Sequence, residues 1–443
     1  FAAAGHQIYL VGGIVRDAVL GRPIGADIDL TTDARPDRTI GLVSGWADAV
    51  WDQGARFGTV GLKKGDTVFE VTTHRAEAYA PDSRKPDVTF ADEVEADLAR
   101  RDFTVNAMAL RVTGAEGEAP ELIDPYDGVA DLAAGRLRTP LAPEISFTDD
   151  PLRMLRAARF IAGYGLAPDD ALVAAVRELV GRLEIVSAER VRDELGKLLV
   201  VDDPSAGLWF LVEAGVADII LPELPAMRVE QDPIHRHKDV LAHTIAVVAK
   251  TRPQLVVRMA ALLHDVGKPK TRSIGSQGVS FHHHEVVGAR MARDRLRALR
   301  FPNEQVDDIS QLVYLHLRFH GYGDDVWTDS AVRRYVRDAG HLLEELNELT
   351  RCDCTTRNEN RARLLARRMD ALEARITELQ EKEELASIRP DLNGEQVMAR
   401  LGISPGPIVG EALAMLLEVR LDEGPVGEEE AYRRLDAWWA ERS

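Results

Sequence analysis

The chain has 443 residues, 45% of them apolar, and a formal net charge of −18. This length exceeds what a single hydrophobic core supports, so it predicts two to four domains, and the apolar fraction is sufficient to fill their cores. The negative charge argues against a protein that coats nucleic acid non-specifically, and no apolar run approaches the roughly 20 residues of a membrane span.

The cysteines and the first residues bear on location. Cys352 and Cys354 are one residue apart, a spacing that suits neither an unstrained disulfide nor a four-ligand zinc site. The chain opens directly into an apolar stretch, without the basic segment and apolar run of a secretory signal. Both features favour a reducing, cytoplasmic location, and no membrane partner is expected.

The first predicted elements form a phosphate-binding turn. Ile8–Val11 is predicted to be a strand, Gly12-Gly13 breaks it, and a helix begins near Val15. Glycine lets backbone N–H groups approach an anion closely. A strand, two glycines and a helix start therefore favour a site for phosphate.

A pair of aspartates follows on the next predicted strand. Asp27 and Asp29 alternate with Ile28 and Leu30, and alternation on a strand points both carboxylates to one face. Two carboxylates beside a phosphate cradle are what a pair of Mg²⁺ ions needs for phosphoryl or nucleotidyl transfer. The alternative is an ordinary surface turn followed by a solvated strand edge.

After these aspartates the sequence predicts a polar loop, a helix that ends near Val50, and a hairpin. The hairpin strands would lie over 57–62 and 68–73, joined by a Lys-Lys-Gly-Asp turn. Glu70 lies on the second of these strands and is the candidate third catalytic carboxylate. A solvated glutamate on a strand face fits the same pattern, so this alternative stays open.

The runs at 9–17 and 27–30 resemble the signature of the polymerase-beta-type nucleotidyltransferases. More narrowly, they are similar to the class II branch, which holds bacterial CCA-adding tRNA nucleotidyltransferases and poly(A) polymerases. The resemblance implies that Asp27 and Asp29 hold two Mg²⁺ ions, and that a loop within 76–97 helps to order the site between additions. It also implies that the nucleotide phosphates are gripped by Gly12, Gly13, Arg16 and Arg101.

A second motif, Arg-Arg-Asp-Phe-Thr-Val-Asn-Ala at 100–107, closely matches the family. Adjacent arginines suit a triphosphate because guanidinium groups bind phosphate oxygens in a bidentate manner. Asp102 could accept from a ribose hydroxyl, and Asn106 belongs to the same nucleotide-binding motif. A capped surface helix is the alternative. Two further elements, around 122–128 and 187–195, are expected to have structural roles.

The segment that we call the neck, residues 141–228, is predicted to begin a helix at Asp149-Asp150-Pro151, with a capping aspartate and a proline in the first turn. In the family this motif reads the incoming base in place of a template. The resemblance implies that Asp150 and Arg153 select CTP and ATP and that Arg156 belongs to the nucleotide site. Carboxylate accepts from the exocyclic amine of C or A, and arginine donates to a ring nitrogen or carbonyl. Asp149 stands where the family usually has Glu, and a helix-capping ion pair is the alternative.

Nine of the twelve histidines lie between His235 and His320. An apolar helix ends there in an adjacent His-Asp pair, and the set resembles the HD phosphohydrolase superfamily. The resemblance implies a divalent metal centre, with His284 and His316 as optional further ligands. Imidazole with carboxylate suits a transition metal or Mg²⁺, with phosphoester hydrolysis as the chemistry. The implied essential ligands are His243, His264, Asp265 and Asp353.

The C-terminal third is predicted to be helical. Residues 361–384 carry apolar side chains at a 4-3-4-3 spacing, which favours packing within the domain. Groups of arginines could bind RNA phosphates, although pairing with neighbouring acids is the alternative. These groups are Arg153, Arg156 and Arg159; Arg290, Arg293, Arg295, Arg297 and Arg300; and Arg357, Arg361, Arg363, Arg367 and Arg368.

Together these patterns predict an α+β protein. A small mixed-sheet nucleotidyltransferase head at 1–140 would precede an all-α neck at 141–228, an HD domain at 229–360 and a helical tail at 361–443. The implied activity is template-independent addition or repair of the 3′-terminal CCA of tRNA from CTP and ATP, with HD phosphohydrolase activity as a further expectation. A poly(A) polymerase, an enzyme that adds only CC or A, and an HD hydrolase with a vestigial nucleotidyltransferase module remain alternatives, and the oligomeric state stays open.

Overall fold

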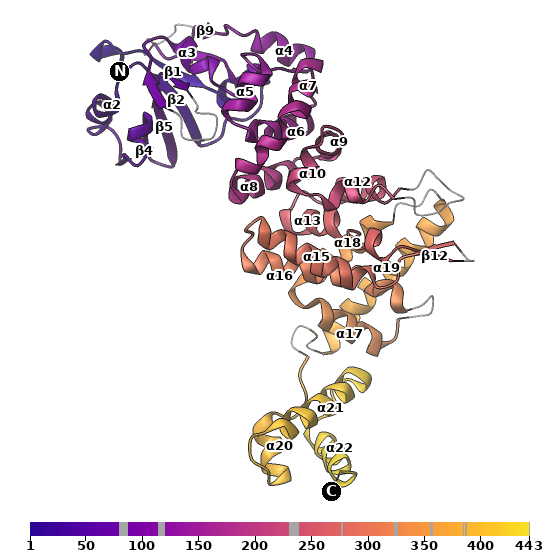
Figure 1. The fold of residues 1–443 in the computed structure, drawn as a ribbon. Coiled ribbons are helices and arrows are strands. Elements are labelled where there is room, and N and C mark those ends of the chain that lie inside the picture. The colour runs from indigo at the N-terminus through magenta and orange to yellow at the C-terminus, as the bar shows by residue number, and fades with distance from the viewer. Residues whose placement is uncertain are drawn as a thin grey trace. The chain divides into compact units, whose positions relative to one another are not determined.

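The computed structural model describes residues 1–78, 87–113, 120–229, 239–275, 278–322, 327–354, 358–383, 385 and 388–442. The chain divides into two compact units, Phe1–Pro225 and Ala226–Ser443 (Figure 1). The expected division into four domains stays a prediction within these units. Residues 79–86 of the expected loop, and Arg357, lie outside the described residues.

A seven-stranded mixed sheet forms the head of the first unit. Its strand order is β3-β4-β5-β2-β1-β8-β9, and only the β2–β5 pair is parallel. The strands are β1 (Ile8–Val11), β2 (Asp27–Thr32), β3 (Ala49–Trp51), β4 (Thr59–Lys64), β5 (Thr67–Thr73), β8 (Ala109–Arg111) and β9 (Leu122–Ile123). The mixed sheet confirms the prediction, and the expected hairpin is present, although β4 begins at Thr59 rather than at 57 and includes Lys63 and Lys64 of the expected turn. The helix expected to reach Val50 is wrong at its end: α2 (Pro36–Val43) stops earlier, and residues 49–51 are strand β3.

The two faces of this sheet have different cores. On one face, Val43 of α2 packs with Leu62 and Val71, against the partly buried Leu30 and Phe69. On the other face, α3 (Val94–Ala99) covers strands β1 and β8. The same apolar cluster includes Ala107, which directly follows the 3-10 helix η3 (Thr104–Asn106). The second face is the one to which alternation turns the aspartates of β2. Shorter elements here are α1 (Gly13–Val19), the β6–β7 hairpin (Arg75–Ala78, Asp87–Phe90), α4 (Gly128–Ala134), and the β10–β11 pair (Arg136–Leu137, Ala167–Pro168).

The rest of the first unit is helical. Its central helix α6 buries Leu152, Leu155 and Phe160 and packs against α8 and α9. Glu194 of α8 is only 3% exposed, accepts a hydrogen bond from Arg159 Nε, and lies 3.8 Å from Arg156 Nη1. The helices are α5 (Pro143–Asp149), α6 (Leu152–Tyr164), α7 (Asp170–Leu179), α8 (Ala188–Leu199), α9 (Ser205–Glu213), α10 (Val216–Ile220) and α11 (Glu223–Ala226).

The second unit is built from helices and one short hairpin. The predicted seam of the long helix α19 is buried at Met369, Leu372, Ile376 and Leu379. The last three helices enclose a small core of their own around Leu392, Leu416 and Leu435. The elements are α12 (Val240–Lys250), α13 (Leu255–Leu263), α14 (Lys268–Thr271), β12 (Ser273–Gly275), β13 (Gly278–Ser280), α15 (His284–Ala298), α16 (Asn303–Leu315), α17 (Asp329–Ala339), α18 (Leu343–Asp353), α19 (Glu359–Lys382), α20 (Gly394–Leu401), α21 (Pro407–Glu423) and α22 (Glu428–Ala440).

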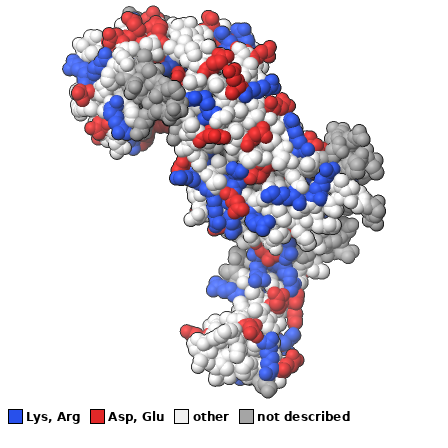
Figure 2. Space-filling model, viewed as in Figure 1, with Lys and Arg blue, Asp and Glu red and all other residues white. Residues whose placement is uncertain are grey.

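Charged side chains of both signs are interspersed on the face shown in Figure 2. Arg293 Nη2 lies 3.4 Å from Asp307 Oδ1, and Arg363 Nη2 lies 3.5 Å from Glu359 Oε2. Exposed pairs of this kind contribute little to stability. Both cysteines are free, and among the described residues no helix combines the length and apolar character that crossing a membrane requires.

Replacing Glu194 with Ala should lower the free energy of unfolding by about 2–3 kcal/mol, because it leaves partly buried guanidinium groups without their acceptor. Urea unfolding followed by circular dichroism measures the effect. Glu178→Ala, at an exposed position of α7, is the matched control and should change stability by less than about 0.5 kcal/mol. Equal losses in the two variants would contradict a special role for the buried carboxylate.

Candidate active site and metal centre

Three carboxylates share one face of the head sheet. Asp27 and Asp29 lie on β2, and the parallel register sets Asp29 directly beside Glu70 of β5. Ile28 and Leu30 turn to the opposite face, where they line an apolar pocket. All three carboxylate residues are exposed, so a dissolved ion and its ligand can reach them.

Gly12 brings the two-glycine turn close to this row of carboxylates, Asp27, Asp29 and Glu70. Gly12 follows β1 and has φ +75°, a conformation that side chains rarely adopt. A Cβ at this position would lie 2.8 Å from Arg101 Nη1 and 4.0 Å from Asp29 Oδ2. The two-glycine turn, Arg101 and the carboxylate of Asp29 therefore lie together, as the sequence led us to expect for a nucleotide phosphate site.

The local charges perturb Asp29. Desolvation by the surrounding chain raises the pKa of its carboxyl group, Arg101 opposes that rise, and the negative charge of Asp27 adds to it. The charged form that would bind a cation is therefore disfavoured when no cation is present. This is the electrostatic condition of a site that gains stability from a bound divalent ion.

Arg100 and Arg101 are anchored by one buried acid. Asp97 accepts from Arg100 Nε at 3.0 Å and from Arg101 Nη2 at 3.1 Å. The two arginines lower the pKa of Asp97 although its burial acts in the opposite direction. Arg101 Nε is buried and has no hydrogen-bond partner among the described residues. The guanidinium group is thus held in place and keeps donor capacity for an anion.

Asp102 is the centre of a hydrogen-bond chain. Its Oδ1 accepts from Asn106 Nδ2 at 2.9 Å and from the Phe103 N–H, and its Oδ2 accepts from Arg156 Nε at 2.8 Å. Burial acts to raise the pKa of this carboxyl group, but Arg156 and Asn106 hold it well below its usual range. Arg16 extends the chain, donating to Asn106 Oδ1 at 2.6 Å.

The two neck residues expected to read the base have separate partners. Asp150 Oδ2 accepts from Arg190 Nη2 at 2.7 Å, and Asp150 Oδ1 accepts from the Leu152 N–H at the start of α6. Arg153 donates to Ser146 Oγ at 2.8 Å and to the Arg100 carbonyl. Arg190 was assigned only a supporting role from the sequence, and its contact joins positions forty residues apart.

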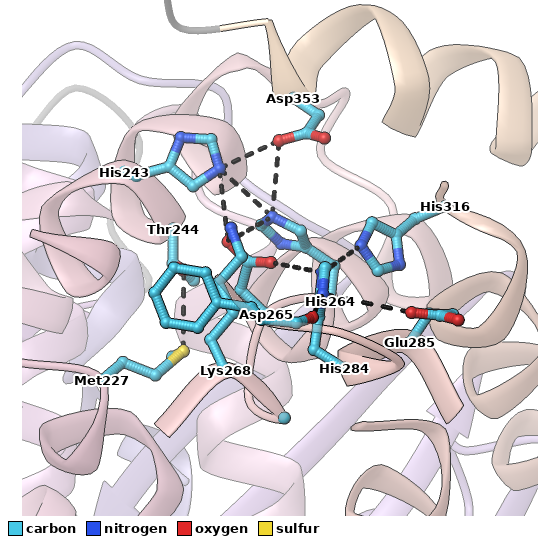
Figure 3. A network of polar contacts seen from close by, with 12 residues as sticks. Met227, His243, Thr244, His264, Asp265, Lys268, His284, Glu285, His316 and Asp353 are labelled. Atoms are coloured by element: carbon cyan, nitrogen blue, oxygen red, sulfur yellow. Dashed lines mark hydrogen bonds and ion pairs between the residues drawn. The ribbon is translucent and has the colours of Figure 1, made fainter. Parts of the chain in front are cut away.

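A second cluster lies in the other unit, where three helices meet (Figure 3). His243 of α12, His264 at the end of α13 and Asp353 at the end of α18 supply it. His243 Nε2 lies 2.9 Å from Asp353 Oδ1 and 3.3 Å from His264 Nε2. Asp265 Oδ2 lies 3.3 Å from His264 Nε2. The structure thus brings together all four residues that the sequence indicated as essential ligands.

Asp265 also faces a second pair of histidines. Its Oδ1 lies 3.4 Å from His284 Nε2, and His284 Nε2 lies 3.2 Å from His316 Nε2. Both groups, His243 with His264 and Asp265, and Asp265 with His284 and His316, have their ligand atoms within 4.8 Å of one another. Asp265 Oδ1 is buried without a hydrogen-bond partner in the described part of the chain. Asp265 could therefore bridge two ions.

Backbone carbonyls fix the orientation of three of these rings. The Nδ1 of His264 donates to the Ala261 carbonyl at 2.7 Å. The Nδ1 of His284 donates to the Phe281 carbonyl at 2.8 Å, and that of His316 to the Val313 carbonyl at 2.6 Å. Each Nε2 therefore faces the cluster, which is the usual arrangement of metal-binding histidines.

The titration behaviour of the cluster also suits a cation. Burial acts to lower the pKa of His264, but Asp265 and Asp353 outweigh it and raise that pKa to about 10. Burial and the neighbouring His264 lower the pKa of His316 to about 3, so the His316 imidazole is neutral at ordinary pH.

Lys268 is a residue of this centre to which the sequence analysis gave no role. Its Nζ lies 2.6 Å from Asp265 Oδ2. Its position three residues after Asp265 was the available signal, since residues so spaced at a helix start can meet.

Comparisons with known proteins agree with this layout. Residues 8–138 match the Poly A polymerase head domain, residues 165–227 the probable RNA and SrmB-binding site of polymerase A, and residues 240–380 the HD domain. The A-adding tRNA nucleotidyltransferase of Deinococcus radiodurans is 35% identical over 451 aligned positions, covering 98% of this chain and 96% of the relative. The CCA-adding enzyme of Enterococcus faecalis is 29% identical over 413 positions, covering 93% and 87%.

A solved structure gives the same result. The CCA-adding enzyme of Bacillus stearothermophilus in complex with CTP has a TM-score of 0.69 and 25% identity. It aligns with 100% of this chain, which covers 95% of that structure.

Replacing Asp29 with Asn should raise the thermal midpoint in the absence of divalent ions, because it removes a carboxylate whose charged form is disfavoured in the fold. The same change should abolish the gain in midpoint that MgCl₂ gives the unaltered protein. Differential scanning fluorimetry with and without MgCl₂ measures both effects. Asp66→Asn, in the exposed β4–β5 turn, is the control. A lower ion-free midpoint with an unchanged response to Mg²⁺ would contradict this description of the site.

Proposed function

The chain belongs to the family of tRNA nucleotidyltransferases and poly(A) polymerases, and from this premise we propose that it completes the 3′-terminal CCA of tRNA from CTP and ATP. It is a nucleotidyltransferase with a Poly A polymerase head and an HD domain. The observation that carries the proposal is the convergence of Asp29, Glu70, Gly12 and Arg101 on one sheet face. Because its substrate is tRNA, we place the enzyme in the cytoplasm.

The head residues divide the work of the transfer. Nucleotidyltransferases of this kind use divalent metal ions, and the exposed carboxylates of Asp27, Asp29 and Glu70 fit Mg²⁺. When bound, Mg²⁺ supplies the charge that activates the RNA 3′-hydroxyl and neutralises the departing pyrophosphate. Arg101 and the Gly12-Gly13 turn hold the triphosphate. Arg16, Asn106 and Asp102 fix the helix that follows this turn.

The neck selects the base. Asp150 accepts from the exocyclic amine that C and A share, and Arg153 donates to a ring nitrogen or carbonyl. Arg190 holds the Asp150 carboxylate by hydrogen bonds from both of its terminal nitrogens. Arg156 supports the pocket through Asp102, and arginines on the neck and the second unit bind tRNA phosphates.

A narrower activity is the main competing candidate. The Deinococcus radiodurans relative, which aligns over nearly the whole chain, is named A-adding. An enzyme with that specificity would extend only tRNA that already ends in CC. A poly(A) polymerase would add ATP without a limit.

Transcripts of one tRNA that end before CCA, at C and at CC, incubated with CTP, ATP or both, test the proposal. We expect all three to be completed to CCA. Asp27→Ala should lower incorporation by at least about a thousandfold, because it removes a carboxylate required at the reacting phosphate. Exclusive extension of the CC transcript by one A would replace the proposal with the A-adding activity, and unlimited ATP addition would replace it with a poly(A) polymerase.

The HD centre has a separate chemistry. HD domains typically bind divalent metals, and Asp265 Oδ1, which is buried without a hydrogen bond from the described residues, fits a carboxylate that bridges two ions. One ion would lie among His243, His264, Asp265 and Asp353, and the other among Asp265 and the second histidine pair. Bound there, such ions supply a hydroxide for phosphoester hydrolysis. Lys268 beside Asp265 would bind a substrate phosphate.

Metal stoichiometry tests this second proposal. After removal of metal and dialysis against Mn²⁺, elemental analysis should find two ions per HD centre, one in His316→Ala and none in Asp265→Ala, because Asp265 alone belongs to both groups. His341→Ala is the control, because His341 is exposed and lies on the 3-10 turn Gly340–Leu342 that precedes α18. Asp265→Ala should extend tRNA at the normal rate. A single ion in the unaltered centre, retained by His316→Ala, would contradict the bridging role.

A further inference from the structure

An exposed tryptophan stands in the same row of the head sheet as the catalytic carboxylates. Trp51 pairs in register with Gly61, Gly61 with Glu70, and Glu70 with Asp29. Residues paired in register point to the same face of a sheet. The indole of Trp51 is 37% exposed, and strand β3, which carries it, is the edge of the sheet.

The glycine at position 61 makes room for this ring. A Cβ on Gly61 would lie 1.9 Å from Trp51 Nε1 and 2.1 Å from Cε2, so the indole lies directly on the glycine backbone. Any larger residue would displace the ring. Glycine weakens a strand interior, and a common reason for its presence is a close approach of this kind. The indole is therefore held as a fixed, partly exposed surface beside Glu70.

Trp51 and the proposed phosphate site lie on opposite sides of Asp29. Gly12 follows β1, on one side of Asp29, whereas β5, β4 and β3 lie on the other side. In nucleotidyl transfer the attacking oxygen and the leaving pyrophosphate lie roughly in line through the reacting phosphorus. If the triphosphate is gripped at Gly12 and Arg101, the RNA 3′-hydroxyl must approach from the side where Trp51 lies. At about 4.8 Å per strand, the indole over Gly61 is about 10 Å from the strand of Asp29.

We propose that Trp51, seated on Gly61, is a stacking platform for an unpaired base at the 3′ end of the RNA that is extended. This inference rests on the nucleotidyltransferase function proposed above. The RNA end changes its terminal base with every addition, so its holder must tolerate different bases. An aromatic face does so, because every base has a π-face and stacking needs no specific hydrogen bond. Lys63, exposed two residues after Gly61 on the same face of β4, supplies a charge for the neighbouring phosphate.

A second tryptophan provides a matched control. Trp46 is 51% exposed, but it lines the apolar pocket on the opposite face of the sheet, where its ring meets the edge of Phe69. Its replacement changes an exposed tryptophan in the same subdomain without touching the proposed platform.

The test is steady-state addition to tRNA transcripts that end before CCA, at C and at CC. Trp51→Val, which keeps a residue suited to an edge strand, should raise KM for every transcript by about 5- to 100-fold, the range expected for one lost base–aromatic stack. KM for CTP and ATP and kcat at saturating RNA should stay within about twofold. Trp51→Phe should keep KM within about threefold of the unaltered enzyme, and Trp46→Leu should leave it unchanged. Unchanged KM for RNA in Trp51→Val would overturn the proposal.

A binding measurement without nucleotide keeps the two proposals separable. A transcript with 2-aminopurine as its terminal base should lose fluorescence on binding to the unaltered enzyme and to Trp46→Leu, and much less on binding to Trp51→Val. Equal quenching by the unaltered enzyme and Trp51→Val would overturn the platform. A protein that quenches as expected yet extends none of the transcripts would instead refute the proposed function. If Trp51→Val is unstable, KM for the transcripts and quenching of 2-aminopurine can still be measured with the unaltered enzyme and with Trp51→Phe.

Discussion

The parallel pairing of β2 with β5 is the constraint on which the head depends. Side chains alternate between the two faces of a strand, so a shift of one residue would turn Asp27 and Asp29 into the apolar core and expose Ile28. Burying an unpaired carboxylate costs several kcal/mol, whereas each correctly buried apolar side chain contributes about 1.5–3 kcal/mol. Both effects favour the same register. That register also aligns Glu70 and Trp51 with the aspartates.

A chain of hydrogen-bonded polar side chains links this sheet to the helices that follow it. Arg16, Asn106, Asp102 and Arg156 each use the next as a hydrogen-bond partner, and Arg156 also approaches Glu194. Buried charges are costly to desolvate, but hydrogen bonds between them make a network rigid. Here it fixes α1, which follows the Gly12-Gly13 turn, relative to α6, which carries Arg153, one of the two residues proposed to select the base. The folded chain itself would thereby set the distance between the proposed triphosphate site and the proposed base site.

Local signals in the sequence predicted most of these parts, and tertiary pairing produced the remainder. The strand–Gly-Gly–helix turn and the β4–β5 hairpin were predicted correctly because alternation and glycine act over a few residues. Strand β3 was missed: three edge residues are too few to show a period, and only their pairing with β4 makes them a strand. The contact of Asp150 with Arg190 joins residues forty positions apart. Nor could the order of the histidines reveal that Asp265 lies between both groups.

The raised pKa of His264 has a consequence for how the HD centre is filled. At neutral pH and without an ion, the imidazole holds a proton, and this positive charge compensates Asp265 and Asp353. A metal ligand must be deprotonated, so uptake of the proposed ion would expel that proton into the solvent. Loading is therefore an exchange of one cation for another, and acidification competes with the metal at the same place. The acidity and the metal supply of the surroundings would together determine how many of the proposed centres hold an ion.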